Sequence, residues 1–215
     1  MTPLLTALIL FASALVPYLL GSINTGIIVS RIVSGTDIRN YGSGNAGMTN
    51  VLRTFGKLPA LITLLGDFGK SVLGVLFARW MFNLLGMQDF DGAYVGGLFA
   101  LLGHIYPLYF GFRGGKGVLT CAGIALVVNP LAFLVGVVVF ISLVLITRYV
   151  SLGSIVGMIA FAVSSSIFSL TAGHPIWETL FVALFAALVV WKHRENLQRL
   201  AAGTERRISL KKNNP

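Results

Sequence analysis

The sequence predicts an all-α integral membrane protein with about seven transmembrane helices. Of its 215 residues, 56% are hydrophobic and only 11% are charged, whereas a soluble domain carries about 25% charged residues. The apolar residues fall into runs near the ~20 residues that a helix needs to cross a bilayer. We expect one transmembrane domain over residues 1–215, with spans at roughly 3–33, 58–84, 93–110, 116–128, 130–147, 152–172 and 175–191.

The first run, 3–33, lacks the positively charged segment that opens a signal peptide, because the first basic residue is Arg31. We therefore interpret this run as an uncleaved span. The runs 3–33 and 58–84 are long enough to tilt or to extend past the bilayer. The run 116–128 is short and is followed by Pro130, so we expect it to be tilted or only partly embedded.

Charged residues indicate the orientation. Basic residues gather in the connections after the first, third and fifth runs and in the C-terminal tail, whereas Asp89, Asp91 and Glu178 lie in the opposite connections. Because cytoplasmic loops carry the excess of Lys and Arg, we expect the N-terminus outside and the C-terminus in the cytoplasm. The net charge of +9 then reflects topology and contact with anionic lipid or substrate, with no indication of nucleic acid binding.

Three polar segments share the predicted cytoplasmic side. The first, residues 37–53, contains glycines that permit close backbone approach and ends in a stretch with helical spacing that predicts a short interfacial helix. The N-terminus of that helix would favour an anion. A flexible connector with topogenic arginines is the alternative interpretation. The polar side chains of interest here are Ser43, Asn45, Thr49, Asn50 and Arg53.

The second segment is the turn Gly114-Gly115-Lys116-Gly117, which leads into the run 116–128. Backbone N–H groups at a helix start, together with one ammonium group, suit a phosphate or a carbonyl oxygen. The glycine spacing differs from that of a Walker A loop and no Ser or Thr follows Lys116, so the turn gives little support to nucleotide binding. A tight membrane turn with topogenic charges is the alternative.

The third segment, residues 191–207, follows the last run. If the last helix continues, His193, Asn196 and Arg199 or Leu200 share one face. A basic tail on anionic lipid is the alternative, but it explains His193 and Asn196 poorly.

Polar residues inside the runs have structural interpretations. Asp67 and Lys70 are three residues apart, which suits an ion pair on one helix face, and we favour a pair that orients the site over one that takes a direct part in catalysis. We expect His104 to be a hydrogen-bonded packing residue and Cys121 to pack as a small apolar side chain. The histidines are dispersed and form no set with metal-ligand spacing, so we expect no metal and no cofactor.

Taken in order along the chain, three motifs resemble those of the bacterial acyl-phosphate:glycerol-3-phosphate acyltransferase family. The likeness covers nearly the whole chain, and its departures, such as Met48 for alanine and Ser71 for glycine, remove no anion-binding group. The motifs are Ser43-Gly44-Asn45 with Thr49-Asn50-Val51-Leu52-Arg53, Gly103-His104 with residues 110–118, and His193-Arg194-Glu195-Asn196 with Arg199, Gly203 and Glu205.

The resemblance implies a seven-helix enzyme of the bacterial cytoplasmic (inner) membrane with its active site facing the cytoplasm. The implied reaction transfers a fatty acyl group from acyl phosphate to the 1-hydroxyl of sn-glycerol 3-phosphate. The products would be lysophosphatidic acid and inorganic phosphate, for phospholipid synthesis. The implied functional partner is an enzyme that makes acyl phosphate from acyl carrier protein, and acyl-CoA is not the expected donor.

The resemblance also implies roles for single residues. Arg53 and Lys116 would bind phosphates, while Ser43 and Asn196 would orient the substrates. The base would be either His193 or a substrate phosphate oxygen, and we favour the phosphate oxygen. The implied catalytic residues are Ser43, Arg53, Lys116, His193 and Asn196, and the implied substrate-binding residues are Asn45, Thr49, Asn50, Gly114, Gly115, Gly117 and Glu205.

A transporter or exchanger of a phosphorylated solute is the rival function, because cationic helix ends also suit that role. Such a protein usually has polar groups at mid-depth and pseudo-symmetric halves. Here the polar motifs gather on one predicted face and the sequence shows no inverted repeat, so the enzyme is the better interpretation.

Overall fold

The computed structural model describes residues 2–87 and 90–208, and the regular structure of these residues is helical. This confirms the predicted all-α class. The chain divides into two compact units, Met1–Pro130 and Leu131–Pro215. The helices of the first unit are α1 (Pro3–Ser22), α2 (Thr25–Ser34), η1 (Ile38–Asn40), α3 (Met48–Phe55), α4 (Lys57–Leu84), α5 (Ala93–Ile105), η2 (Leu108–Phe110) and α6 (Val118–Val128). Those that follow are α7 (Pro130–Thr147), α8 (Val150–Thr171), α9 (Ile176–Lys192) and α10 (Arg194–Ala201).

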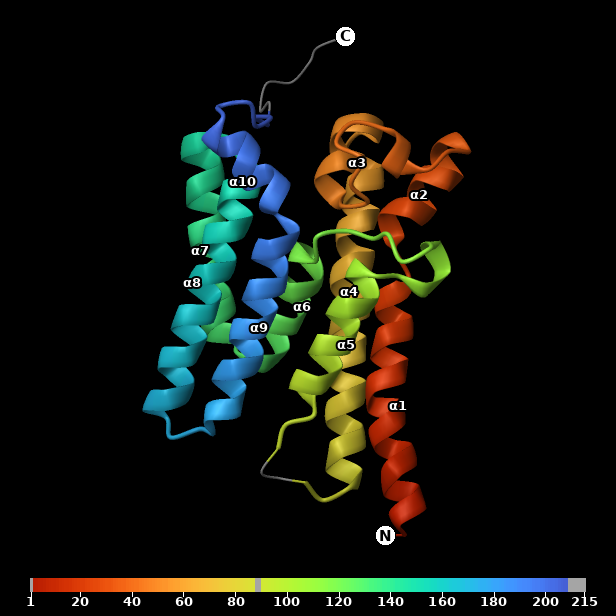
Figure 1. The fold of residues 1–215 in the computed structure, drawn as a ribbon, viewed down its shortest axis with the longest axis vertical. Helices are drawn as coiled ribbons and strands as arrows, with labels where there is room; N and C mark the ends of the chain where they lie inside the picture. Colours follow the sequence, from red (N-terminus) through yellow and green to blue (C-terminus); the bar gives the residue numbers. More distant parts are fainter. Residues whose placement is uncertain (1, 88–89, 209–215) are drawn as a thin grey trace. The chain divides into compact units, whose positions relative to one another are not determined.

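The first unit is built on three helices that pack side by side, α1, α4 and α5, with α6 against α4 and α5 (Figure 1). Glycines bring the backbones together. A Cβ atom at Gly21 would overlap the carbonyl oxygen of Ala100, and one at Gly103 would overlap that of Tyr18. Small residues at helix contacts are typical of membrane proteins, and here they hold the C-terminal end of α5 against α1.

The first predicted span contains a break between α1 and α2 that the sequence did not predict. The carbonyl oxygen of Ile23 accepts a hydrogen bond from Lys70 Nζ at 2.7 Å, and the N–H of Thr25 donates to Asp67 Oδ1 at 3.3 Å. Irregular backbone at membrane depth requires such partners, because lipid offers none. The polar side chains of α4 therefore permit the break.

The predicted short helix after the first span is confirmed as α3. It ends at Gly56, whose φ of +85° favours glycine, and α4 begins at the next residue, Lys57. Val51 of α3 is buried with Ile27 and Ile38. In Figure 1, α3 and the loop before it lie at the end of this unit opposite the N-terminus of α1.

Fewer helices are long enough to cross a membrane than the seven spans predicted from the sequence. Among the described residues, five stretches are long and apolar enough to cross a membrane, and α9 with α10 forms a sixth if the bent pair is one span. Helix α6 has 11 residues and is about 16 Å long, well short of the ~30 Å hydrocarbon core. The expectation that this segment is only partly embedded agrees with its length. The five stretches are Pro3–Ser34, Lys57–Leu84, Ala93–Phe110, Pro130–Thr147 and Val150–Thr171.

The second unit is a set of antiparallel helices. Helices α7 and α8 approach closely at Gly136 and Gly157, where a Cβ on either glycine would lie 2.9–3.0 Å from the other's carbonyl oxygen. Helix α8 also packs on α9 (Figure 1). The last span does not continue straight, because α9 ends before His193 and α10 departs from it at 56°. The condition under which His193 would share a continuous helix face with Asn196 is therefore not met.

Candidate functional site

Asn50 organises the first polar loop. Its Oδ1 accepts from the N–H of Ser43 at 3.0 Å, and its Nδ2 donates to the carbonyl oxygens of Tyr41 at 2.9 Å and Asn45 at 3.0 Å. The Asn50 side chain is only 3% exposed. A Cβ at Gly42 would overlap Asn50 Oδ1, which explains the glycine there. The side-chain amide thus pairs with loop backbone and fixes the position of Ser43.

The other predicted residues of this loop lie around the same turn. Ser43 is exposed, and Asn45 Oδ1 accepts from the N–H of Gly47 at 3.0 Å, which shapes the entry to α3. Thr49 is half-buried in the first turn of α3, and Arg53 is exposed in the last turn. The structure therefore brings the predicted residues of the first segment together on one short helix and its preceding loop.

Arg39 fastens this loop to the glycine turn, and sequence reasoning missed it. Its Nη1 donates to the carbonyl oxygens of Phe110 at 2.9 Å and Arg113 at 2.7 Å, while its Nε and Nη2 donate to Asp37 at 3.0 and 2.8 Å. The hydrogen bond from the Arg39 side chain lowers the pKa of Asp37 from 3.8 to about 2. A planar guanidinium group can serve both sets of acceptors at once.

The glycine turn is folded back on the end of α5. The N–H of Gly114 donates to the carbonyl oxygen of Ile105 at 3.1 Å, and that of Gly115 donates to the carbonyl oxygen of His104 at 3.2 Å. A Cβ at Gly114 would overlap His104 O, and one at Gly115 would overlap His104 Nε2. Two of the backbone donors that we expected at phosphate are therefore already paired with α5.

The turn ends where α6 begins. Gly117 is the N-cap of α6 and has a φ of +85°, and Lys116 immediately before it is half-buried. The N-terminal end of an α-helix carries a partial positive charge. The chain thus joins an ammonium group directly to a helix start, as the sequence indicated.

A buried ion pair lies within the same unit. Lys70 Nζ is 2.9 Å from Asp67 Oδ1, which confirms the predicted pair, and 3.0 Å from His104 Nδ1. His104 Nδ1 is in turn 3.7 Å from Asp67 Oδ1. Asp67 is 1% exposed, His104 3% and Lys70 6%. The expectation that His104 is a hydrogen-bonded packing residue is confirmed, with Lys70 as its partner.

In the second unit, Glu205 collects three hydrogen bonds. Its Oε1 accepts from Ser151 Oγ and Asn196 Nδ2, each at 2.8 Å, and its Oε2 accepts from Arg199 Nε at 2.8 Å. Burial raises the pKa of Glu205, but the hydrogen bonds from Asn196, Arg199 and Ser151 outweigh it, and the pKa is lowered overall. An ionised carboxylate therefore ties the tail to α10 and α8. Ser151 is a partner that the sequence did not suggest.

His193 occupies the bend between α9 and α10 and is 3% exposed. Its Nδ1 lies 2.8 Å from the carbonyl oxygen of Val189. A carbonyl oxygen can only accept, so Nδ1 carries the hydrogen, and in the neutral ring Nε2 then has the lone pair. His193 is held by its own helix in the tautomer that can accept a hydrogen bond at Nε2.

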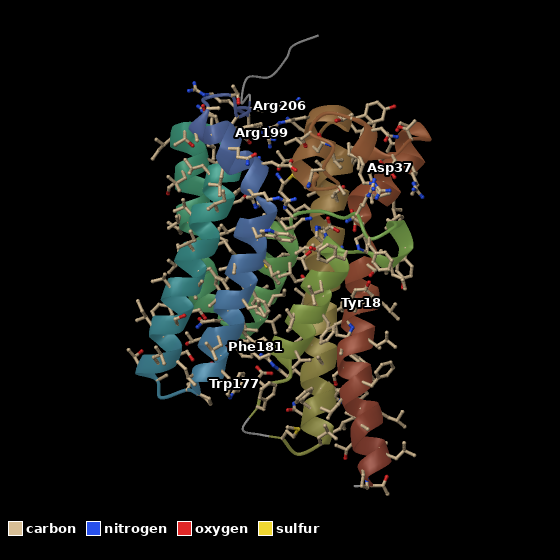
Figure 2. All side chains as sticks on the ribbon, viewed as in Figure 1. Tyr18, Asp37, Trp177, Phe181, Arg199 and Arg206 are labelled. Atoms are coloured by element: carbon tan, nitrogen blue, oxygen red, sulfur yellow. The ribbon has the colours of Figure 1, made fainter. Side chains whose placement is uncertain are left out.

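The two ends of the second unit differ in character. Figure 2 shows Arg199 and Arg206 near the end that carries α10, and Trp177 and Phe181 near the opposite end of α9. In the first unit, Asp37 lies toward the end that carries α3, and Tyr18 lies within the length of α1 (Figure 2).

The fold defines the class as a helical integral membrane protein whose polar motifs lie in loops and at helix ends. A family model described as glycerol-3-phosphate acyltransferase matches residues 11–203. The chain belongs to this glycerol-3-phosphate acyltransferase family, and it is a membrane acyltransferase.

Individual relatives agree with this assignment. The glycerol-3-phosphate acyltransferase of Clostridioides difficile is 46% identical over 200 residues, which cover 93% of this chain and 95% of that protein. The enzyme of the same name from Geobacter sulfurreducens is 46% identical over 205 residues, or 95% and 99% of the two chains. A crystal structure of PlsY, an integral membrane glycerol 3-phosphate acyltransferase, in its glycerol 3-phosphate form is also similar. It has a TM-score of 0.81 and 38% identity, and the match covers 94% of this chain and 96% of that chain.

Proposed function

We propose that this acyltransferase uses acyl phosphate as its donor and forms lysophosphatidic acid and inorganic phosphate. The acceptor is the 1-hydroxyl of sn-glycerol 3-phosphate. The observation that supports the proposal most is the Arg39 bridge, which ties the loop of Ser43 to the turn of Lys116. Both substrates carry phosphate, and this bridge links two phosphate-binding elements into one assembly. The structurally similar PlsY has also been crystallised in a lysophosphatidic acid form, at 36% identity and a TM-score of 0.79.

In the first unit, Arg53 and Lys116 bind the phosphate groups. Arginine matches two phosphate oxygens with its planar fork, while lysine acts as a point charge. The N–H groups of Gly114 and Gly115 donate to α5, so we assign the backbone contacts to Gly117 and the start of α6. Gly114 and Gly115 then serve the site by close packing. Ser43 donates a neutral hydrogen bond, and Asn45, Thr49 and Asn50 shape the loop around it.

In the second unit, Asn196 and His193 orient glycerol 3-phosphate. Asn196 is 5% exposed and donates to Glu205, which fixes its amide. We assign Glu205 a positioning role, because a carboxylate repels phosphate and this one has three donors already. The lone pair on His193 Nε2 suits a hydrogen bond from a substrate hydroxyl.

The chemistry requires no covalent enzyme intermediate, because acyl phosphate is an activated mixed anhydride. The 1-hydroxyl oxygen attacks the acyl carbonyl carbon, and the bond from that carbon to the phosphate oxygen breaks. The hydroxyl proton passes to a substrate phosphate oxygen, while Lys116 or backbone N–H groups stabilise the carbonyl oxyanion. Positioning of two anions and stabilisation of the oxyanion supply the rate enhancement.

The location follows from the same proposal. A bacterial cytoplasmic membrane would give access to glycerol 3-phosphate, a soluble cytoplasmic anion, and to lipid for the acyl chain. The basic residues after α1, α5 and α7 and in the tail support a cytoplasmic position for these loops. Acyl phosphate must be supplied by an enzyme that transfers an acyl group to phosphate, with acyl carrier protein as the proposed source.

The donor is tested with purified protein in detergent, given glycerol 3-phosphate and either palmitoyl phosphate or palmitoyl-CoA. We expect lysophosphatidic acid from palmitoyl phosphate alone. Product from palmitoyl-CoA alone would overturn the donor assignment. Uptake of glycerol 3-phosphate into liposomes without any acyl product would favour the rival transporter.

A further inference from the structure

The buried Asp67, Lys70 and His104 have no part in the reaction described above. They lie inside the first unit, on α4 and α5, and none is more than 6% exposed. Ionisable residues within membrane helices are costly and are usually functional. The contacts of these three residues indicate that they position the neighbouring backbone.

The donors and acceptors around Lys70 determine the state of His104. Lys70 Nζ has three acceptors within 3.0 Å, namely Asp67 Oδ1 at 2.9 Å, Ile23 O at 2.7 Å and His104 Nδ1 at 3.0 Å. An ammonium group has three hydrogens and no lone pair. His104 Nδ1 must therefore accept, and its ring carries the hydrogen on Nε2. This is the opposite tautomer to that of His193.

The Nε2 edge of His104 faces the glycine turn. A Cβ at Gly115 would overlap this nitrogen, so the ring and the turn are in van der Waals contact. The carbonyl oxygen of His104 also accepts from the N–H of Gly115 at 3.2 Å. Lys70 thus holds the residue that supports Gly115, and Gly115 directly precedes Lys116.

The same group also holds the break in the first span. Lys70 bonds the carbonyl oxygen of Ile23, and Asp67 accepts from the N–H of Thr25. Helix α2, which begins at Thr25, leads into the loop of Ser43. Asp67, Lys70 and His104 therefore contact both the backbone that leads into the loop of Ser43 and the glycine turn.

We propose that Asp67, Lys70 and His104 are positioning residues that set the height and orientation of the glycine turn relative to α5. This inference rests on the proposed function in one respect, namely that the glycine turn is a phosphate-binding element. A buried ion pair adds little net stability compared with apolar residues of the same volume. The role of the Asp67–Lys70 pair is then to hold the neighbouring backbone in one conformation, and the glycine turn is the segment that it holds.

The test uses two variants of the full-length protein that leave no buried charge unpaired. Asp67→Asn with Lys70→Met removes both charges at similar volume, and His104→Phe keeps the ring shape but removes the Nδ1 acceptor. Ser71→Ala is the matched control, because Ser71 is buried next to Lys70 and, within residues 2–87 and 90–208, its hydroxyl donates to the carbonyl oxygen of Phe68 in its own helix. Hydrogen–deuterium exchange over residues 111–118 reports the turn directly, and exchange over 176–192 reports the rest of the fold.

We expect exchange over 111–118 to quicken roughly tenfold in both test variants, with residues 176–192 and the Ser71→Ala control unchanged. We also expect the apparent affinity for a phosphate substrate to fall by about tenfold to a hundredfold, as small misplacements of binding groups do. An exchange rate over 111–118 that is the same in both test variants as in the wild type would overturn the proposal. Equally faster exchange over 176–192 would also overturn it, since the cluster would then only hold the fold.

The exchange measurement needs no catalysis, so it separates this inference from the proposed function. If wild-type protein fails to transfer the acyl group but the variants loosen residues 111–118 alone, the proposed function fails and the positioning role stands. If wild-type protein is active and the turn is unaffected in both variants, the positioning role fails and the proposed function stands.

Discussion

Asn50 Oδ1 accepts a hydrogen bond from the backbone N–H of Ser43 at 3.0 Å. The same side chain donates to the carbonyl oxygens of Ile38, Tyr41 and Asn45, so one buried amide of α3 determines the backbone path around an exposed serine. This relationship separates two kinds of residue within the first motif. Ser43 is available to a substrate, and Asn50 fixes where Ser43 stands.

Replacement of Asn50 by alanine should therefore impair acyl transfer without any loss of substrate contact by Asn50 itself. Each buried backbone group left unpaired costs about 1–3 kcal/mol, and the loop would relax to avoid that cost. We expect kcat/KM to fall roughly a hundredfold, measured by lysophosphatidic acid formation. Thr36→Ala is the control, because the Thr36 hydroxyl is hydrogen-bonded to that of Ser34 and not to the loop of Ser43 in the part of the chain that the structure describes. Equal activities of Asn50→Ala and wild type would show that the loop keeps its shape without the amide.

Arg39→Lys should be costly although the charge is conserved. Arg39 spreads these contacts over Nε, Nη1 and Nη2, whereas a lysine has its three hydrogens on one nitrogen and lacks the planar fork, so it would lose part of the bridge between the two polar elements. We expect kcat/KM to fall about tenfold or more. Arg31→Ala provides the comparison, because Arg31 is exposed, donates one hydrogen bond to Asp37 and, among the described residues, lies over the ring of Phe110 without bonding a carbonyl oxygen of the glycine turn, and exposed pairs contribute little. A larger loss in Arg31→Ala than in Arg39→Lys would contradict the bridge.

Gly115→Ala should disrupt the site by overlap of the new methyl group with His104 Nε2. Because Gly115 also bonds His104 O, the turn cannot move away without loss of that hydrogen bond. We expect loss of most activity and a lower thermal unfolding midpoint. Gly69→Ala is the matched control, since no atom lies within 4 Å of a Cβ there and alanine favours a helix by about 1 kcal/mol. Tolerance of alanine at Gly115 would mean that the turn is not packed on His104.

His193→Ala distinguishes binding from base catalysis. If His193 only orients glycerol 3-phosphate, KM for that substrate rises and kcat at saturation falls by less than about tenfold. A general base contributes about 10²–10⁴-fold. We expect the first result, because the proposed proton acceptor is a phosphate oxygen. A kcat loss of about a thousandfold at saturating substrate would assign the base to His193.

Glu205 should make stability depend on acid pH. Its pKa is lowered in the folded protein from the ordinary value of 4.5, so its ionised form stabilises the fold above that value. The contribution is lost as the pH falls from 4.5 through the folded pKa. We expect wild type to unfold at a higher temperature than Glu205→Gln near neutral pH, and the difference to shrink below pH 4.5. A difference that grows on acidification would contradict the assigned hydrogen bonds.

Sequence patterns predicted the features that depend on local spacing. The Asp67–Lys70 pair follows from helical periodicity, and α3 follows from apolar residues at helical spacing after a glycine-rich loop. The start of α6 next to Lys116 follows from the glycine turn. These features require only neighbours along the chain, and the structure has each of them.

Other features depend on partners far along the chain and could not be predicted. Arg39 donates to Arg113, 74 residues away, and no spacing rule connects them, so the sequence shows Arg39 only as one of several basic residues after the first apolar run. The same holds for Ser151 and Glu205, which are 54 residues apart. The break at Ile23 depends on Lys70 as its donor. Long-range hydrogen bonds that satisfy loop and helix-end carbonyls give no periodic signal.

The most direct test of the account follows phosphate release from palmitoyl phosphate by purified protein, with and without glycerol 3-phosphate. Direct transfer predicts that lysophosphatidic acid and inorganic phosphate form in equal amounts when the acceptor is present. It also predicts no release above spontaneous hydrolysis when the acceptor is absent. A burst of one phosphate per protein without acceptor would reveal an acyl-enzyme and contradict direct transfer between two bound substrates.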